Sequence, residues 1–222
     1  MVMLLRGRRA GPSAWSDLEG PWTTCFNLAW EAYRAGTVPA GAVVTDGAGD
    51  VVARGRSRVH DREAPPGRFC NSPLAHAEID AVLLLPPDVR YEHHTLWTTL
   101  EPCLLCVGAV VTACVGTVRW ASSDPYAGAT GAVCENPHTA RLPLGGGGPL
   151  DGPMGLVGAV LHLEPFVRNN PRGAVVAAYR LRAPQAAVAA ETLAARQTLQ
   201  RAAAAGARFA DVIDDILVAL PR

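Results

Sequence analysis

The chain contains no lysine, no long apolar run and no excess of charge of either sign. All 20 of its basic residues are arginine, and 20 acidic residues balance them to a formal net charge of zero. No apolar stretch approaches the roughly 18–20 residues that would span a bilayer. Met1 to Arg9 places its arginines after a short apolar patch, whereas a secretory signal places its charges before a longer one. We therefore expect a cytoplasmic protein that has no membrane partner.

The balanced charge also bears on nucleic-acid binding. The complete lack of lysine is typical of a genome-wide codon preference, so the arginines do not by themselves indicate phosphate recognition. Up to residue 150 the chain has 12 arginines against 14 acidic residues, and after it 8 against 6. Neither part has the strong positive field of a protein that grips a polyanion.

At 222 residues, the chain is long enough for one full core with a small appendage. Its composition, 49% hydrophobic and 18% charged, is typical of a globular protein. Of the six cysteines, only Cys103 and Cys106 have the spacing of metal ligands. A disulfide framework is the less favoured use of the rest in a cytoplasmic chain. We expect them to be buried small side chains: Cys25, Cys70, Cys114 and Cys134.

Helical and β-prone segments alternate along the first part of the chain. The apolar spacing predicts helices over 23–35, 74–85 and 102–113, and strands over 42–44, 51–53, 95–100 and 115–122. A turn signal at 46–50 joins the first two strands into a hairpin, and 58–73 is a proline-containing loop. This alternation argues for an α/β layered fold.

Three regions follow from the composition. We expect a flexible N-terminal tail over 1–20, a core over 21–143, and a glycine-rich break followed by an Ala-rich helical extension over 144–222. In the extension only the last helix is distinctive, because its apolar residues share one face. We expect this stripe to pack in the core, with a dimer surface as the alternative: Phe209, Val212, Ile213, Ile216, Leu217 and Leu220.

Two short stretches carry the chemistry, the HAE triplet at 76–78 and the PCLLC run at 102–106. A catalytic zinc takes three protein ligands and leaves a fourth position for water. Cys103 and Cys106 project from one turn at the start of a predicted helix, where the helix dipole favours thiolates. His76, at the start of a second helix, supplies the third ligand. Glu78 is then predicted to move protons rather than to bind the metal.

Each piece alone also has a structural interpretation. A lone histidine near a helix start is more often a cap or a core side chain. A lone Cys-x-x-Cys pair also occurs in redox sites and as half of a structural zinc site, for which His93-His94 is the only close second pair. The conjunction of His-x-Glu, a strand and Pro-Cys-x-x-Cys is the pattern of zinc deaminases.

From about Thr23 to Pro137 the chain resembles the cytidine deaminase superfamily, in the branch of bacterial tRNA adenosine deaminases and guanine or nucleoside deaminases. The likeness rests on 38–44 (VPAGAVV), the two zinc stretches and 127–132 (AGATGA). It implies a three-layer α/β/α sandwich with a five-stranded mixed sheet, and one zinc ion between two helix N-termini. It also implies that His76, Cys103 and Cys106 are the ligands and that Glu78 is the proton shuttle.

The departures from the family pattern fall on the substrate side. Ser57 stands where relatives commonly have an asparagine that binds the base or sugar. The connection from Ser57 to His76 is longer than in relatives, and 71–74 (NSPL) differs from their usual run. The resemblance leaves a set of candidate substrate contacts: Pro39, Ala40, Ser57, Leu100, Glu101, Pro102 and Asp124.

Three functions remain open. The favoured one is hydrolytic deamination of a free nucleobase, nucleoside or related small aminated heterocycle, with release of ammonia. The alternative is a tRNA adenosine deaminase acting at the wobble position, which the neutral charge disfavours because RNA anchoring ordinarily needs a basic surface. The third is a non-catalytic relative with a structural zinc, against which Glu78 argues. We also expect a homodimer, as in many relatives.

Overall fold

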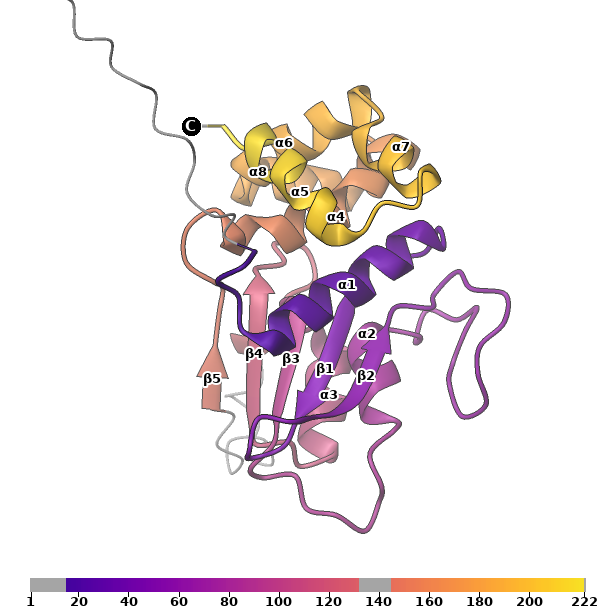
Figure 1. Ribbon diagram of the computed structural model, residues 1–222, viewed down its shortest axis with the longest axis vertical. Coiled ribbons are helices and arrows are strands. Elements are labelled where there is room, and N and C mark those ends of the chain that lie inside the picture. The colour runs from indigo at the N-terminus through magenta and orange to yellow at the C-terminus, as the bar shows by residue number, and fades with distance from the viewer. Residues whose placement is uncertain (1–14, 132–144, 222) are drawn as a thin grey trace, which may run out of the picture.

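A five-stranded mixed sheet lies between two layers of helices in the computed structural model, which describes residues 15–131 and 145–221 (Figure 1). The strand order is β2-β1-β3-β4-β5. Strand β1 is antiparallel to both neighbours, and β3, β4 and β5 are parallel. The predicted three-layer α/β/α fold is therefore confirmed. The strands are β1 (Gly41–Thr45), β2 (Val51–Arg56), β3 (Thr95–Leu100), β4 (Thr117–Ser122) and β5 (Gly145–Gly147).

The predicted hairpin is formed by β1 and β2. Asp46 closes its turn, because the Asp46 Oδ1 atom accepts hydrogen bonds from the backbone N–H groups of Ala48 and Asp50 at 2.9 and 3.0 Å. An aspartate that caps its own turn in this way is a common hairpin device. The hairpin forms one edge of the sheet, and its strand β2 ends at Arg56, directly before Ser57.

One face of the sheet is covered by α1 (Gly20–Arg34) and α4 (Met154–Asn169). Their apolar side chains share a core with Val43 and Trp97 of the sheet. Helix α4 packs closely on the sheet at Gly158, where any larger residue would place its Cβ against the Thr99 carbonyl oxygen. This approach brings α4 over the ends of β3 and β4.

The opposite face is covered by α2 (Ala77–Val82) and α3 (Leu104–Thr112). Both helices are shorter than predicted, since each begins only after its zinc-ligand candidate. His76 and Cys103 are the N-cap residues and have extended backbone, with ψ angles of 157° and 173°. Pro102 consequently precedes the helix instead of lying in its first turn, which corrects the sequence prediction.

The C-terminal helices form a cluster that packs on α1 and α4 (Figure 1). The predicted apolar stripe lies in a 3-10 turn, Phe209–Asp211, and in the last helix. Phe209, Val212, Ile213 and Ile216 are buried, and Leu217 and Leu220 are partly buried against the same core, so the stripe packs mainly in the core. The helices are α5 (Ala174–Arg182), α6 (Pro184–Ala195), α7 (Thr198–Ala204) and α8 (Ile213–Ala219).

Residues on either side of the predicted core also take part in the fold. Trp15 lies in the region expected to be a flexible tail, yet its ring packs edge-on against Phe26 and Phe209 at centroid distances of 6.4 and 5.3 Å. The glycine run expected to be a break supplies β5, because Gly145–Gly147 pair with β4. Residues 1–14 and 132–144 lie outside the described residues, and the boundary at residue 143 stays a prediction.

The cysteines outside the metal pair are only partly as expected. Cys25 is fully buried, where its thiol donates to the Trp97 carbonyl oxygen. Cys70 is half-buried and Cys114 is exposed, so these two are not core side chains. Cys114 follows α3 with a φ angle of 57°, and this left-handed turn directs it outward. Cys134 lies outside the described residues. None of the described helices is long and apolar enough to cross a bilayer.

Candidate zinc and substrate site

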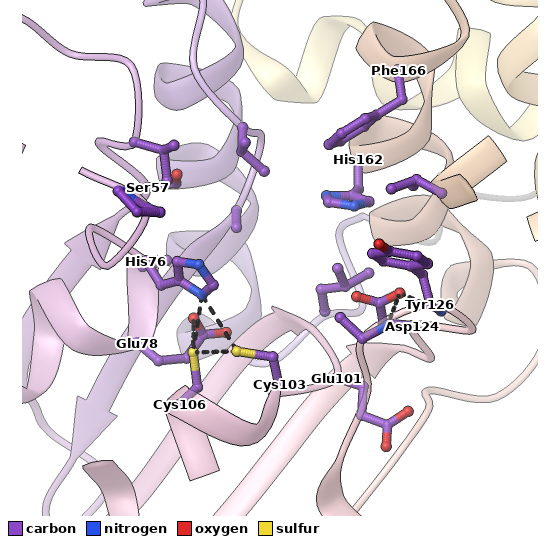
Figure 2. Close-up of a pocket in the computed structure, with 18 residues that line it drawn as sticks. Ser57, His76, Glu78, Glu101, Cys103, Cys106, Asp124, Tyr126, His162 and Phe166 are labelled. Carbon is purple, nitrogen blue, oxygen red and sulfur yellow. Dashed lines mark hydrogen bonds between the residues drawn. The ribbon is translucent and has the colours of Figure 1, made fainter. Parts of the chain in front are cut away.

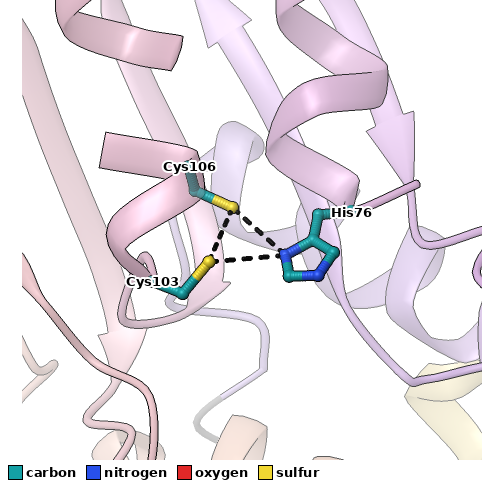
Figure 3. Close-up of side chains that lie close together, drawn as sticks. All are labelled: His76, Cys103 and Cys106. Atoms are coloured by element: carbon teal, nitrogen blue, oxygen red, sulfur yellow. Dashed lines mark hydrogen bonds between the residues drawn. The ribbon is translucent and has the colours of Figure 1, made fainter. Parts of the chain in front are cut away.

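Two helix N-termini bring three potential metal ligands together (Figure 3). His76 caps α2 and Cys103 caps α3, while Cys106 lies in the first turn of α3. The extended backbone at both caps turns the two side chains across the gap between the helices. The ligands come from segments 27 residues apart in the chain, and the sheet holds the two helix starts side by side.

The three ligand atoms have the spacing that zinc requires. The His76 Nδ1 atom lies 3.3 Å from Cys106 Sγ and 3.5 Å from Cys103 Sγ, and the two sulfurs are 3.4 Å apart. Tetrahedral bonds of about 2.3 Å to sulfur and about 2.0–2.1 Å to nitrogen would separate such atoms by about 3.6–3.8 Å. A small adjustment admits the ion, so His76, Cys103 and Cys106 fit a zinc site. No other such cluster occurs in the described part of the chain.

Glu78 lies directly beside these ligands and is buried (Figure 2). Its Oε1 atom accepts a hydrogen bond from Thr98 Oγ1 at 2.6 Å, and its Oε2 atom accepts one from Cys106 Sγ at 3.2 Å. Thr98 belongs to the central strand β3 and fixes one carboxylate oxygen. The second oxygen lies beside the ligand cluster. Once Cys106 is a zinc-bound thiolate it has no proton to donate, and this oxygen is free to accept another one.

The ligand protons are unevenly distributed. The hydrogen bond between the two sulfurs lowers the pKa of Cys103 to about 4. The same bond, together with burial and the Glu78 carboxylate, raises the pKa of Cys106. The Cys103 thiolate in turn raises the pKa of His76. Because a metal ligand must be deprotonated, zinc binding here would release protons.

A cavity of about 320 Å³ opens above the ligands. This volume lies in the range of small-molecule sites. Five of the seven predicted substrate contacts lie on its wall: Ala40, Ser57, Leu100, Glu101 and Asp124. Pro39 and Pro102 do not line it. The Pro102 carbonyl oxygen instead accepts the N–H of Ala129 and supports the loop beyond Asp124.

The predicted contacts on the wall differ in whether their polar side-chain atoms already have hydrogen-bond partners. Ser57 is buried, and its Oγ atom has no hydrogen-bond partner among the described residues. Asp124 uses its Oδ1 atom to accept from the N–H groups of Tyr126 and Ala127. The Glu101 carboxylate accepts from Thr130 Oγ1 at 2.6 Å and is directed toward that loop. Ser57 is thus the one whose side-chain polar atom is left unpaired.

Residues 17–122 match the family model of the cytidine and deoxycytidylate deaminase zinc-binding region. This span contains His76, Glu78 and both cysteines. The match covers just under half of the chain, and in this part the chain is similar to zinc-type deaminases. For this likeness we call residues 17–122 the deaminase region.

Relatives of this deaminase region carry different names. A tRNA-specific adenosine deaminase of Bacillus subtilis is 36% identical over 46% of this chain and 60% of its own length. A tRNA(Ile)-lysidine synthase of Deinococcus radiodurans is 35% identical over 49% of this chain, but only 18% of its own length. The chain thus spans less than two thirds of either relative.

Solved structures similar to the chain include deaminases of two kinds. One, from work on A-to-I editing by tRNA deaminases at the wobble position, is 26% identical, covers 58% of this chain and 96% of its own, and has a TM-score of 0.49. A guanine deaminase from Bacillus subtilis is 28% identical, covers 48% and 66%, and has a TM-score of 0.39.

The sequence prediction missed one wall of the cavity. His162 and Phe166 of α4 and Val175 of α5 line it, as does Tyr126 at its rim. The first three lie beyond the deaminase region, in the extension whose chemistry was expected to fade. The available signal was a histidine, His162, inside an apolar run. Periodicity predicts which residues share a helical face, but it does not predict which element or cavity that face contacts.

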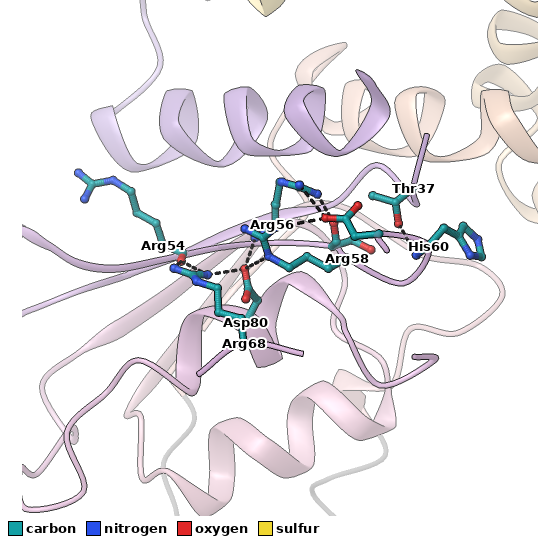
Figure 4. A network of polar contacts seen from close by, with 9 residues as sticks. Thr37, Arg54, Arg56, Arg58, His60, Arg68 and Asp80 are labelled. Carbon is teal, nitrogen blue, oxygen red and sulfur yellow. Dashed lines mark hydrogen bonds and ion pairs between the residues drawn. The ribbon is translucent and has the colours of Figure 1, made fainter. Parts of the chain in front are cut away.

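The long connection before His76 is fastened by charge (Figure 4). Asp80 of α2 is buried, and its Oδ2 atom accepts from Arg58 at 3.3 Å and from Arg68 at 2.5 Å. Asp61 binds Arg56 at 2.7 Å and Arg58 at 3.2 Å. The arginines of the loop therefore neutralise carboxylates of the deaminase region.

Proposed function

We propose that the chain is a zinc-dependent hydrolytic deaminase of an uncharged aminated heterocycle, a free base or a nucleoside, and that it releases ammonia. The observation that supports this most is the buried Glu78 carboxylate, held beside the His76–Cys103–Cys106 cluster at the base of a cavity. A purely structural zinc site would need neither the carboxylate nor the cavity.

Glu78 has the geometry of a proton carrier. When bound, zinc supplies Lewis-acid activation of a water molecule near neutral pH. Glu78 Oε2 accepts the proton that leaves the attacking water, while Thr98 holds Oε1 in place. The same oxygen delivers this first proton to the ring nitrogen, then takes the remaining proton of the added hydroxyl and passes it to the departing amine. A C–O bond forms, the C–N bond breaks, and ammonia leaves.

The charges around the cavity favour an uncharged substrate. Its wall contains the carboxylates of Glu78 and Asp124, and none of the described residues that line it is an arginine. The arginines beside and after Ser57 are engaged by Asp61 and Asp80. A phosphorylated substrate would meet negative charge without a free cation.

The alternative is a tRNA adenosine deaminase that takes a flipped base. The observation in its favour is the likeness to the tRNA-specific adenosine deaminase of Bacillus subtilis over 106 residues. We rank it second, because RNA anchoring needs a phosphate-binding surface, and the net charge of the chain is zero.

Ammonia release separates the two candidates. The zinc-loaded protein is assayed with adenine, adenosine, guanine, guanosine, cytosine, cytidine, dCMP and a tRNA anticodon stem-loop. We expect turnover of at least one unphosphorylated compound and little or none of dCMP. Activity on the stem-loop alone would overturn the proposal in favour of the alternative.

The Glu78→Gln variant tests the chemistry. The amide keeps the size of the side chain but cannot carry the proton, so zinc content should stay at one equivalent while kcat falls by about 10²–10⁴-fold. Cys114→Ala, at an exposed cysteine away from the cavity, is the matched control and should retain full turnover. Wild-type ammonia release by Glu78→Gln would contradict the assignment of Glu78.

We also propose that the chain forms a homodimer through α2 and α3. Most of the Phe209–Leu220 stripe is buried, whereas Leu104 of α3 is 69% exposed, and other leucines in or beside these neighbouring helices are exposed as well. Leu104→Glu should convert a dimer to a monomer by light scattering. Val218→Glu, at an 84% exposed position of α8, is the control. A wild-type monomer would refute the proposal. The exposed leucines in or beside α2 and α3, apart from Leu104, are Leu74, Leu83, Leu84 and Leu105.

A further inference from the structure

The C-terminal helices close the cavity on the side away from the zinc ligands. Figure 2 shows the imidazole of His162 facing the cavity from α4, across from His76 and Ser57. Phe166, one turn later on the same helix, and Val175 of α5 continue this wall. The metal side and this second wall therefore come from separate parts of the chain.

Two buried polar side chains on these walls lack partners. Ser57 is 2% exposed and His162 is 9% exposed. Neither Ser57 Oγ nor His162 Nδ1 has a hydrogen-bond partner among the described residues. Burial without a partner costs free energy, so unpaired polar groups in a cavity wall indicate that a polar ligand completes the site. Nδ1 is enclosed, whereas Nε2 is not among the enclosed atoms and is the ring nitrogen that faces a ligand.

The His162 ring is held by its neighbours. Its centroid lies 5.0 Å from that of Phe166 and 6.0 Å from that of Tyr179, which is fully buried. Burial lowers the pKa of His162, so the ring is neutral at pH 7 and presents one donor and one acceptor. A fixed neutral imidazole is suited to recognition, because little motion is lost when a ligand binds.

Helix α4 itself is fixed on both sides of His162. Gly158, one turn before it, packs against β3. Glu164, two residues after it, is fully buried and accepts hydrogen bonds from Tyr33 Oη at 2.8 Å, Arg168 Nε at 3.0 Å and Gln200 Nε2 at 2.7 Å. These bonds join α1, α4 and α7 and set the position of the helix over the cavity.

We propose that His162 is a substrate-specificity residue, whose imidazole hydrogen-bonds the edge of the bound ring on the side opposite Ser57. The inference rests on the proposed function, since it requires a small ring above the zinc ligands. His162 then distinguishes rings by the donor or acceptor they present toward α4. A buried hydrogen bond of this kind discriminates strongly, because the wrong ring leaves the partner unpaired.

Equilibrium binding tests this role separately from turnover. Dissociation constants for adenine, guanine and cytosine are measured by calorimetry on the zinc-loaded Glu78→Gln protein and on the same protein with His162→Phe. We expect binding of the preferred base to weaken at least about tenfold. We expect a smaller loss for the other two, so that selectivity falls. His162→Gln, which keeps a donor and an acceptor, should recover most of the preference.

A second histidine controls for general damage. His93→Phe changes an exposed histidine outside the cavity and should leave all three constants unchanged. If His162→Phe does not fold by circular dichroism, His162→Leu takes its place. Unchanged selectivity in a folded His162 variant would overturn this role alone. Failure of all three bases to bind the Glu78→Gln protein would overturn this role, whereas ammonia release from a nucleoside would leave the proposed function standing.

Discussion

Cys103 and Cys106 have the same side chain, yet the fold lowers the pKa of Cys103 and raises the pKa of Cys106. Cys103 lies half-buried at the N-cap of α3, whereas Cys106 is buried and donates to the Glu78 carboxylate. A thiolate next to a carboxylate is disfavoured, which raises the pKa of Cys106 in the absence of a metal ion. Position within one helical turn thus decides which sulfur is charged first.

Replacing Cys103 tests the ligand set at this scale. Cys103→Ala removes the charged ligand and leaves two donors, which do not hold zinc in a three-ligand site. Changes to outer-shell partners alone cost about 10–100-fold in metal affinity, so loss of a ligand should cost at least that. Elemental analysis after dialysis against a chelator measures the effect. One retained equivalent of zinc would show that the cluster is misassigned.

The residues of the metal side could be predicted from the sequence, because spacing along a chain determines which side chains share a helical turn. His76, Glu78 and the two cysteines meet where the motif places them. His162 could not be predicted as a cavity residue. Its place depends on how α4 packs across the sheet, and nothing within the helix itself specifies that partner.

At the scale of elements, the loop between β2 and α2 is anchored to the helix that begins at His76. Asp80 lies one turn after His76 and binds Arg58 and Arg68 from the two ends of the loop. It also accepts the backbone N–H of Arg56 at 3.0 Å. The length of this loop was visible in the sequence. Its attachment was not, because arginines and aspartates in a loop are solvated by default.

Asp80→Asn tests this attachment. The amide lacks the charge that the buried Oδ2 atom offers to two guanidinium groups, and breaking a buried ion pair costs about 3 kcal/mol of unfolding free energy. Urea denaturation measures the loss. Glu92→Gln, in the exposed pair with Arg90, is the control and should leave the midpoint unchanged. Equal midpoints for both variants would show that the network adds no stability.

At the scale of the whole molecule, burial of His162 couples stability to pH. The pKa of this imidazole is lowered, chiefly by burial and further by His76, while Asp124 opposes the shift. The unfolded chain therefore binds a proton at His162 more readily than the folded one. Stability should be complete above the ordinary pKa of about 6.5 and should decline as the pH falls toward the lowered folded value.

Comparison with His162→Phe isolates this contribution, since the other titrating groups are shared. Unfolding free energies of both proteins are measured in urea at pH 8 and pH 5.5. We expect the wild-type protein to lose more stability over this interval than the variant. An equal loss would mean that the pKa of His162 is the same in the folded and the unfolded protein.

The two-part wall of the cavity has a consequence for how the substrate of such a protein can change in evolution. Its floor, with the metal ligands and Glu78, is encoded by one stretch of sequence, and its ceiling, from His162 to Val175, by another. Under the proposed role of His162, substitutions in the second segment can change which ring binds without altering the zinc ligands or Glu78. Likeness in the zinc motif alone therefore indicates the reaction and does not identify the substrate.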